Sequence, residues 1–106
     1  MPKYLLRASY TQAGAKGLIA DGGSKRLAVI TAAAASVGGS VDAAYWAFGD
    51  DDFIGIFDLP GNAAAAALSL TVAATGAVGT KTTVLMSATE VDEAVKLHPS
   101  YTPPGA

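Results

Sequence analysis

Apolar and polar positions alternate in some parts of the chain and recur with a helical period in others. Four segments have the alternation or the β-branched and aromatic residues typical of strands: residues 3–10, 40–48, 53–59 and 81–86. The second and third are separated only by Gly49 and three aspartates, which predicts a hairpin with a polar turn. The pattern therefore predicts four short strands, two of them joined directly.

Helices are predicted in the segments between and after these strands. Thr11 is suited to cap a helix over 12–20, and Ser24 to cap a second that ends at Gly38 and Gly39. Four apolar residues of this second helix recur on one helix face: Leu27, Ile30, Ala34 and Val37. A third helix is predicted from Asn62 to about Ala77. The sequence of residues 87–90, SATE, is a capping box that predicts a short helix to about Leu97.

The resulting order is β-α-β-β-α-β with a terminal helix, which predicts an α+β fold of the ferredoxin-like, split-βαβ type. Its four-stranded antiparallel sheet carries helices on one face. With 106 residues we expect one domain over 1–97 and an irregular tail over 98–106, which contains three prolines.

The uncharged stretch over 59–80 is long enough to span a bilayer, but its many Ala, Gly, Ser and Thr residues favour a helix packed against the sheet. The N-terminal residues lack the long apolar core of a signal peptide. We therefore expect a cytoplasmic protein that does not enter a membrane.

Composition excludes several classes of function. The net charge of −2 gives no electrostatic reason to bind nucleic acid or an anionic membrane. The chain has no cysteine, which excludes thiolate nucleophiles and zinc–cysteine sites, and its only histidine is His98. We expect no metal and no cofactor.

The second and third strands are apolar on both faces, and only 15% of the residues are charged. Helices cover one face of such a sheet, so the other face needs a different cover. A second copy of the chain is the expected cover, because most oligomers are homodimers. The alternative is a monomer in which Tyr45 and Trp46 fill a packed rim.

From Pro2 to about Leu97 the chain resembles the GYD-domain family, which is placed in the dimeric α/β-barrel superfamily. The resemblance rests on Tyr10-Thr11, Gly14, Lys16, Gly38-Gly39, the run from Tyr45 to Gly49, Asp58-Leu59-Pro60, Gly76, the strand from Thr80 to Thr83, and Glu90-Val91. Gly49 and Asp52 match a spaced version of the Gly-Tyr-Asp motif, while Asp51 stands where tyrosine is usual. The resemblance implies a dimer with facing sheets and a cavity between sheet and helices or between sheets.

Three candidate ligand-binding residues lie in or beside the strands. Arg7, in the first strand, is suited to hold a carboxylate or phosphate. The alternatives are an ion pair with Asp58 or Asp42, or a strand-edge arginine that reaches water. Tyr45 and Trp46 alternate faces, so one is expected in the core and the other at the interface. As a pocket wall they would stack on a planar ligand.

The other candidates lie outside the strands. Arg26 follows a glycine turn into a helix start, a place that binds anions, although the spacing is not that of a P-loop. Three adjacent aspartates, residues 50–52, favour a solvated turn over a Ca²⁺ or Mg²⁺ site. His98 is the default general base, and the alternative is a solvated residue of the tail.

Two functions remain open at this point. The first is a homodimeric binding or assembly module that holds a small apolar or aromatic ligand. The second, suggested by fold analogy, is a cofactor-free monooxygenase or isomerase acting on a small aromatic or quinone-like substrate. In an enzyme, the general base would come from Asp42, Asp58 or Tyr45. A salt-bridged Asp58 would instead indicate a structural role.

Overall fold

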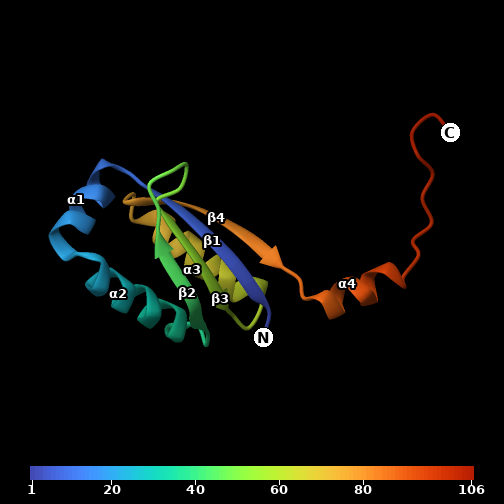
Figure 1. Ribbon diagram of the computed structural model, residues 1–106, viewed down its shortest axis with the longest axis horizontal. Helices are drawn as coiled ribbons and strands as arrows, with labels where there is room; N and C mark the ends of the chain where they lie inside the picture. Colours follow the sequence, from blue (N-terminus) through green and yellow to red (C-terminus); the bar gives the residue numbers. More distant parts are fainter.

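The computed structural model describes the whole chain, residues 1–106, as one four-stranded sheet with four helices (Figure 1). In chain order the elements are β1 (Lys3–Tyr10), α1 (Gln12–Asp21), α2 (Gly23–Ser36), β2 (Ser40–Trp46), β3 (Phe53–Asp58), α3 (Asn62–Ala74), β4 (Val78–Leu85) and α4 (Ala88–Val95). The predicted element order is confirmed, including the two separate helices between the first and second strands.

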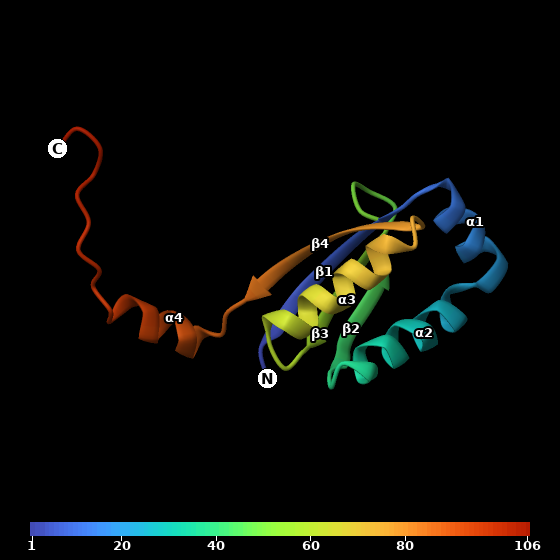
Figure 2. The same cartoon turned by 180° about the vertical axis from the view of Figure 1, so that it is seen from behind.

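The strands lie in the order β2-β3-β1-β4, and every neighbouring pair is antiparallel. Both α2 and α3 lie on the same side of the sheet, α2 near β2 and α3 over β4, as Figure 2 shows. This arrangement confirms the α+β, ferredoxin-like fold.

The core lies between the sheet and these two helices. Alternate residues of β1, Tyr4, Leu6 and Ala8, point to the helices and are buried, as are Phe53 and Phe57 of β3. Their partners from the helices are mostly small: Ala34, Ala65 and Leu68. Small side chains allow the helices to approach the strands closely, which explains the alanine-rich sequence of α2 and α3.

Two glycines set element boundaries, in agreement with the helix break predicted after residue 20 and the helix end predicted near Ala77. Gly22 adopts φ +78°, in the left-handed region that favours glycine, and separates α1 from α2. Gly22, not Ser24, is the N-cap of α2, and it provides no side-chain cap. Gly76 adopts φ +74° after α3, so the uncharged stretch over 59–80 divides into α3 and the start of β4. None of the helices has the length and apolar character needed to cross a membrane.

The other face of the sheet, here called the open face, has no helix over it. It carries the remaining alternate residues: Lys3, Leu5, Arg7 and Ser9 of β1, Ala43 and Tyr45 of β2, Ile54, Ile56 and Asp58 of β3, and Gly79, Lys81, Thr83 and Leu85 of β4. Tyr45 is 70% exposed and Ile54 38% exposed. Strands β2 and β3 are therefore mainly apolar on both faces, as the sequence indicated.

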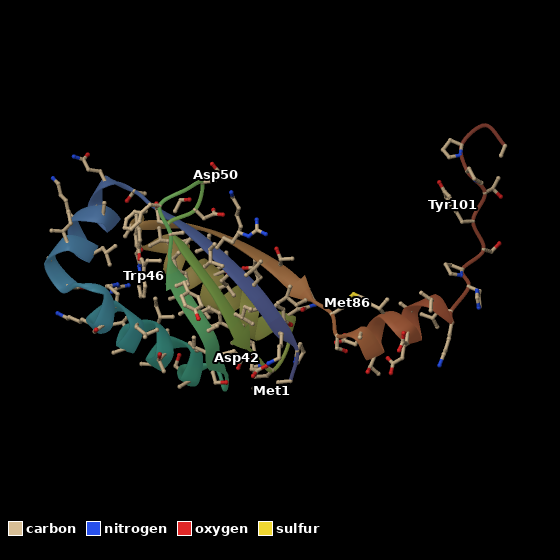
Figure 3. The ribbon with its side chains drawn as sticks, viewed as in Figure 1. Met1, Asp42, Trp46, Asp50, Met86 and Tyr101 are labelled. Carbon is tan, nitrogen blue, oxygen red and sulfur yellow. The ribbon has the colours of Figure 1, made fainter.

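Residues 86–106, here called the arm, extend away from the rest of the chain, here called the body (Figure 1). The helix predicted after the capping box forms as α4 but has no extensive contact with the body. The radius of gyration is 16.9 Å, whereas a compact chain of this length has about 13 Å. Figure 3 shows Met86 at the start of the arm and Tyr101 far from the sheet.

Candidate functional site

A cavity of about 100 Å³ lies between the sheet and the helices α2 and α3. Ala33 of α2 is among the small side chains that line it. Its lining is mainly apolar and includes Leu6, Tyr10, Ile30, Ala33, Phe53 and Val72. The polar lining residues are Arg7, Arg26, Ser69 and Thr80. This mainly apolar recess between sheet and helices is the candidate site.

A second hollow of about 240 Å³ adjoins the cavity beside α1 and the turn between α3 and β4. Three residues line both spaces: Tyr10, Arg26 and Val78. Glycines of α1, Gly14 and Gly17, line the second hollow only. The two spaces therefore meet at a boundary where the apolar lining gives way to polar groups.

Arg26 is the charged group at this boundary. The break at Gly22 turns the chain so that Arg26 lies in the first turn of α2, and its side chain is half-buried. Its Nη1 lies 3.8 Å from Oδ2 of Asp21, and Nζ of Lys25 lies 3.4 Å from Oδ1 of the same carboxylate. Asp21 is shared between two cations, so the guanidinium keeps donors for another anion.

Three aromatic side chains make one wall of the cavity rigid. The Trp46 Nε1–H donates a hydrogen bond of 2.9 Å to the hydroxyl of Tyr10. The Trp46 ring packs edge-on against Phe53, with ring centres 5.2 Å apart. Figure 3 shows Trp46 at the end of β2, toward α1 and α2. Trp46 therefore supports the wall from behind, while Tyr10 and Phe53 line the cavity.

The structure brings only some of the predicted site residues together. Arg26 and Trp46 lie at the cavity. Arg7 is among its lining residues, but strand alternation puts its side chain on the open face with Tyr45, so its backbone forms the lining. The pair Tyr45 and Trp46 therefore divides between open face and core, as the alternation indicated.

Asp58 has a structural role at the end of the sheet. The Lys3 ammonium donates hydrogen bonds to the carboxylates of Asp42 and Asp58, with 2.9 Å to Oδ1 of Asp58. The hydrogen bond from Lys3, followed by one with Asp42, holds the pKa of Asp58 below its ordinary value of 3.8. A lowered pKa opposes a role as general base. Of the two structural alternatives for Arg7, the ion pair with these carboxylates is wrong, because Lys3 occupies them, whereas Arg7 is exposed to water.

His98 lies in the arm, with its side chain exposed and φ +45°. His98 therefore lies away from the cavity of its own chain. No group of three or more histidine, aspartate or glutamate side chains is placed to hold a metal ion.

A family model of the GYD domain matches residues 4–95. The chain belongs to the GYD domain family. Neither curated proteins nor solved structures give a match to the chain. The family assignment covers every element from β1 to α4, and it agrees with the motifs that the sequence shares with the family.

The acidic turn of this GYD domain is less solvated than the sequence indicated. Asp50 is exposed, but the other two aspartates are half-buried. Asp52 accepts a hydrogen bond of 2.8 Å from the Tyr10 backbone N–H through Oδ2. Oδ1 of Asp51, at the position where the family usually has tyrosine, is buried without a hydrogen bond and lies 3.7 Å from Nζ of Lys81. The turn is thus tied to β1 and β4.

Most residues that line the cavity were not singled out in the sequence of this GYD domain. Tyr10 and Phe53 look like ordinary core positions, and Ile30 was assigned only to a helix face. The available signal was the small-residue composition of α2 and α3, since helices without large side chains leave space above a sheet. Composition alone does not indicate where that space lies.

The lining chemistry suits binding more than proton transfer. The cavity has hydroxyl groups from Tyr10, Ser69 and Thr80 and a cation from Arg26, but no carboxylate and no imidazole. Ser69 is already engaged, because its Oγ lies 2.6 Å from Oγ1 of Thr82. An apolar recess with a few polar groups at one end is typical of a site that orients a small ligand.

Proposed function

We propose that this GYD domain is a homodimeric small-molecule-binding protein, whose ligand has an apolar body of about one ring and an anionic end. The observation that carries the ligand proposal is the apolar cavity with Arg26 at its boundary. An apolar body would fill the recess, and its anionic group would face the guanidinium.

The volume supports a ligand of this size. An apolar cavity of about 150 Å³ in another protein binds benzene, and the cavity here is about 100 Å³ and opens toward the second hollow. A single aromatic ring or a short branched alkyl group therefore fits if the opening accepts part of it. A larger polycyclic molecule would have to displace α2 or α3.

The charge at the boundary supports an anion. A guanidinium binds a carboxylate through two parallel N–H donors, an arrangement stronger than a neutral hydrogen bond. Arg26 is held by Asp21 at 3.8 Å, a distance longer than a good hydrogen bond, so a ligand carboxylate can compete for it. A neutral molecule of the same shape would lack this contribution.

The open face supports the dimer. Its apolar side chains, Leu5, Tyr45, Ile54 and Ile56, lie together on adjacent strands, and no element of the same chain covers them. A monomeric protein seldom exposes such a contiguous apolar surface. The second copy hides this face, while the cavity lies on the opposite side of each sheet.

Ligand binding is tested with benzoate and its neutral isostere benzamide, by isothermal titration and saturation-transfer NMR. We expect benzoate to bind more tightly than benzamide. Arg26→Gln should remove most of the difference, which for a charge-assisted contact is about tenfold in Kd. Equal binding of both compounds, unaffected by Arg26→Gln, would contradict the role of Arg26.

The cavity itself is tested by filling it. Ala33→Leu adds a larger side chain to the lining and should abolish binding of both probes. Ala32→Leu, on the exposed side of the same helix, is the matched control and should leave binding unchanged. Because the lining offers no group suited to be a general base, the proposal does not extend to catalysis.

A further inference from the structure

The arm contains a helix that needs a partner. Helix α4 has eight residues, whereas an isolated helix shorter than about 12–15 residues is marginal in water. Its capping box, in which Ser87 and Glu90 exchange hydrogen bonds, supports only its first turn. Since the body gives α4 no extensive contact, the packing that stabilises it has to come from another surface.

One side of α4 is suited to such packing. Positions 88, 91, 94 and 95 fall on one side of the helix, where they form an apolar stripe made of Ala88, Val91, Ala94 and Val95. Val91 and Val95 are 45% and 63% exposed. Glu90 and Asp92 border the stripe on its two sides. The arm carries three acidic residues and one lysine, so it holds the whole net charge of −2, and the body is neutral.

The open face has a region of complementary charge. Arg7 of β1 and Lys81 of β4 stand directly opposite each other in the strand register, with Leu5 and Thr83 as the next such pair. These four residues are here called the cationic half of the open face. Lys81 has Asp51 at 3.7 Å, while Arg7 has no carboxylate at ion-pair distance. Arg7 is exposed and has no acidic partner within the body, so it is available for charge-complementary contact with an acidic group from outside.

The area of the open face also indicates an additional contact. Four strands of up to eight residues span roughly 19 by 26 Å, or roughly 500 Å². A stable interface of standard size buries about 800 Å² on each partner. Two facing sheets alone therefore fall short, and an arm that reaches the partner would supply the remainder.

We propose that the arm of each copy packs on the cationic half of the open face of a second copy, with the apolar stripe on Leu5 and Thr83 and Asp92 near Arg7. The apolar half of the open face, on β2 and β3, then contacts the other sheet. This inference rests on the proposed homodimer and is independent of ligand binding.

The absence of cysteine from the chain allows a direct test by disulfide cross-linking. A full-length Val95→Cys variant is mixed with a full-length Thr83→Cys variant and oxidised, and a Thr89→Cys variant, on the opposite side of α4, replaces the first as a control. We expect a cross-linked heterodimer of positions 95 and 83 in severalfold higher yield than with position 89, because a disulfide needs Cβ atoms about 4 Å apart.

Other outcomes separate the arm from the dimer. If sedimentation shows a dimer but positions 95 and 83 do not cross-link between chains, the arm proposal is wrong and the homodimer stands. If the double variant Thr83→Cys/Val95→Cys forms only a disulfide within one chain, the arm folds onto its own body and the proposal is also wrong. A monomer at all concentrations would overturn both.

The contributions of the apolar stripe and of the Arg7–Asp92 contact are tested by measuring the dissociation constant of the dimer. Val91→Asp should raise it at least about tenfold, since it puts a charge into an apolar contact, whereas Thr89→Asp adds the same charge outside the stripe and should have little effect. Arg7→Glu should weaken the dimer, and Arg7→Glu/Asp92→Lys should restore part of the loss. Equal effects of Val91→Asp and Thr89→Asp, or no restoration, would contradict the proposed packing.

Discussion

Asp52 shows how one side chain ties the hairpin turn to the sheet. Its Oδ2 accepts from the Tyr10 N–H, and its backbone N–H donates to the Ala8 carbonyl oxygen. We expect Asp52→Ala to lower the free energy of unfolding by about 1–2 kcal/mol, the usual cost of an unpaired, partly buried donor. Asp52→Asn keeps an acceptor and should lose less. Urea denaturation measures both.

Asp50→Ala is the matched control, since Asp50 is exposed in the same turn. Its effect should stay within about 0.5 kcal/mol. Losses of equal size at positions 50 and 52 would show that net charge, and not the hydrogen bond to Tyr10, determines the stability of the turn.

The Lys3 cluster predicts a dependence of stability on pH. Hydrogen bonds to Asp42 and then Asp58 raise the pKa of Lys3 above 10.5, and the one from Lys3 lowers the pKa of Asp58 below 3.8. A carboxyl whose folded pKa is lowered stabilises the protein above its unfolded pKa, and this contribution is lost as pH falls through the folded value. The raised pKa of Lys3 gives a contribution that is present below 10.5 and lost as pH rises beyond it.

We therefore expect the difference in urea midpoint between the wild type and Lys3→Met to be largest near neutral pH and to shrink below about pH 4. The effect should be small, because these side chains are solvated. A difference that grows on acidification would contradict the lowered pKa of Asp58.

At the scale of elements, α1 gives a sharp contrast between two glycines. A Cβ on Gly14 would overlap the carbonyl oxygen of Ala77, at the turn where the Thr11 hydroxyl also bonds the Gly76 and Ala77 carbonyls. Gly14→Ala should thus lower the free energy of unfolding by about 1–3 kcal/mol, as overpacking does.

A Cβ on Gly17 would meet nothing within 4 Å. Gly17→Ala should then raise the free energy of unfolding by about 0.5–1 kcal/mol, because alanine loses less backbone entropy in a helix. Thermal unfolding followed by circular dichroism compares the two variants. The same sign for both would mean that α1 is not held against the turn after α3.

Local sequence patterns predicted an element well where the residues of that element alone determine its bounds. The alternation of β1 gave its exact bounds, and Ser87 and Glu90 form the predicted capping box. The division at Gly22 agrees with the two helices predicted there, but the N-cap of the second was misplaced at Ser24, because Gly22 provides no side chain that would mark it as a cap. β4 begins at Val78, earlier than predicted, because the Gly79 region pairs with β1 despite its weak strand propensity.

At the scale of the whole molecule, the residue pattern indicated the two apolar faces of β2 and β3, and the family resemblance implied a cavity between sheet and helices. Neither indicated which residues line the cavity, nor that residues 86–106 extend away from the body. The position of the cavity depends on the spacing between α2 and α3, which are far apart in the sequence. The extended arm reflects the lack of extensive contact between α4 and the body. Of the residues proposed from sequence, Arg26 and Trp46 lie at the cavity. Asp58 serves the end of the sheet, and Tyr45 lies on the open face with the Arg7 side chain.

Sedimentation equilibrium of the wild type and Tyr45→Asp shows whether a second copy covers the open face. We expect twice the mass of one chain for the wild type, and for Tyr45→Asp a folded protein shifted toward the monomer, since Tyr45 lies outside the core. Ala32→Asp adds the same charge at an exposed position of α2, on the other side of the sheet, and should remain dimeric. A folded wild-type monomer at all concentrations would mean that no second copy covers the open face.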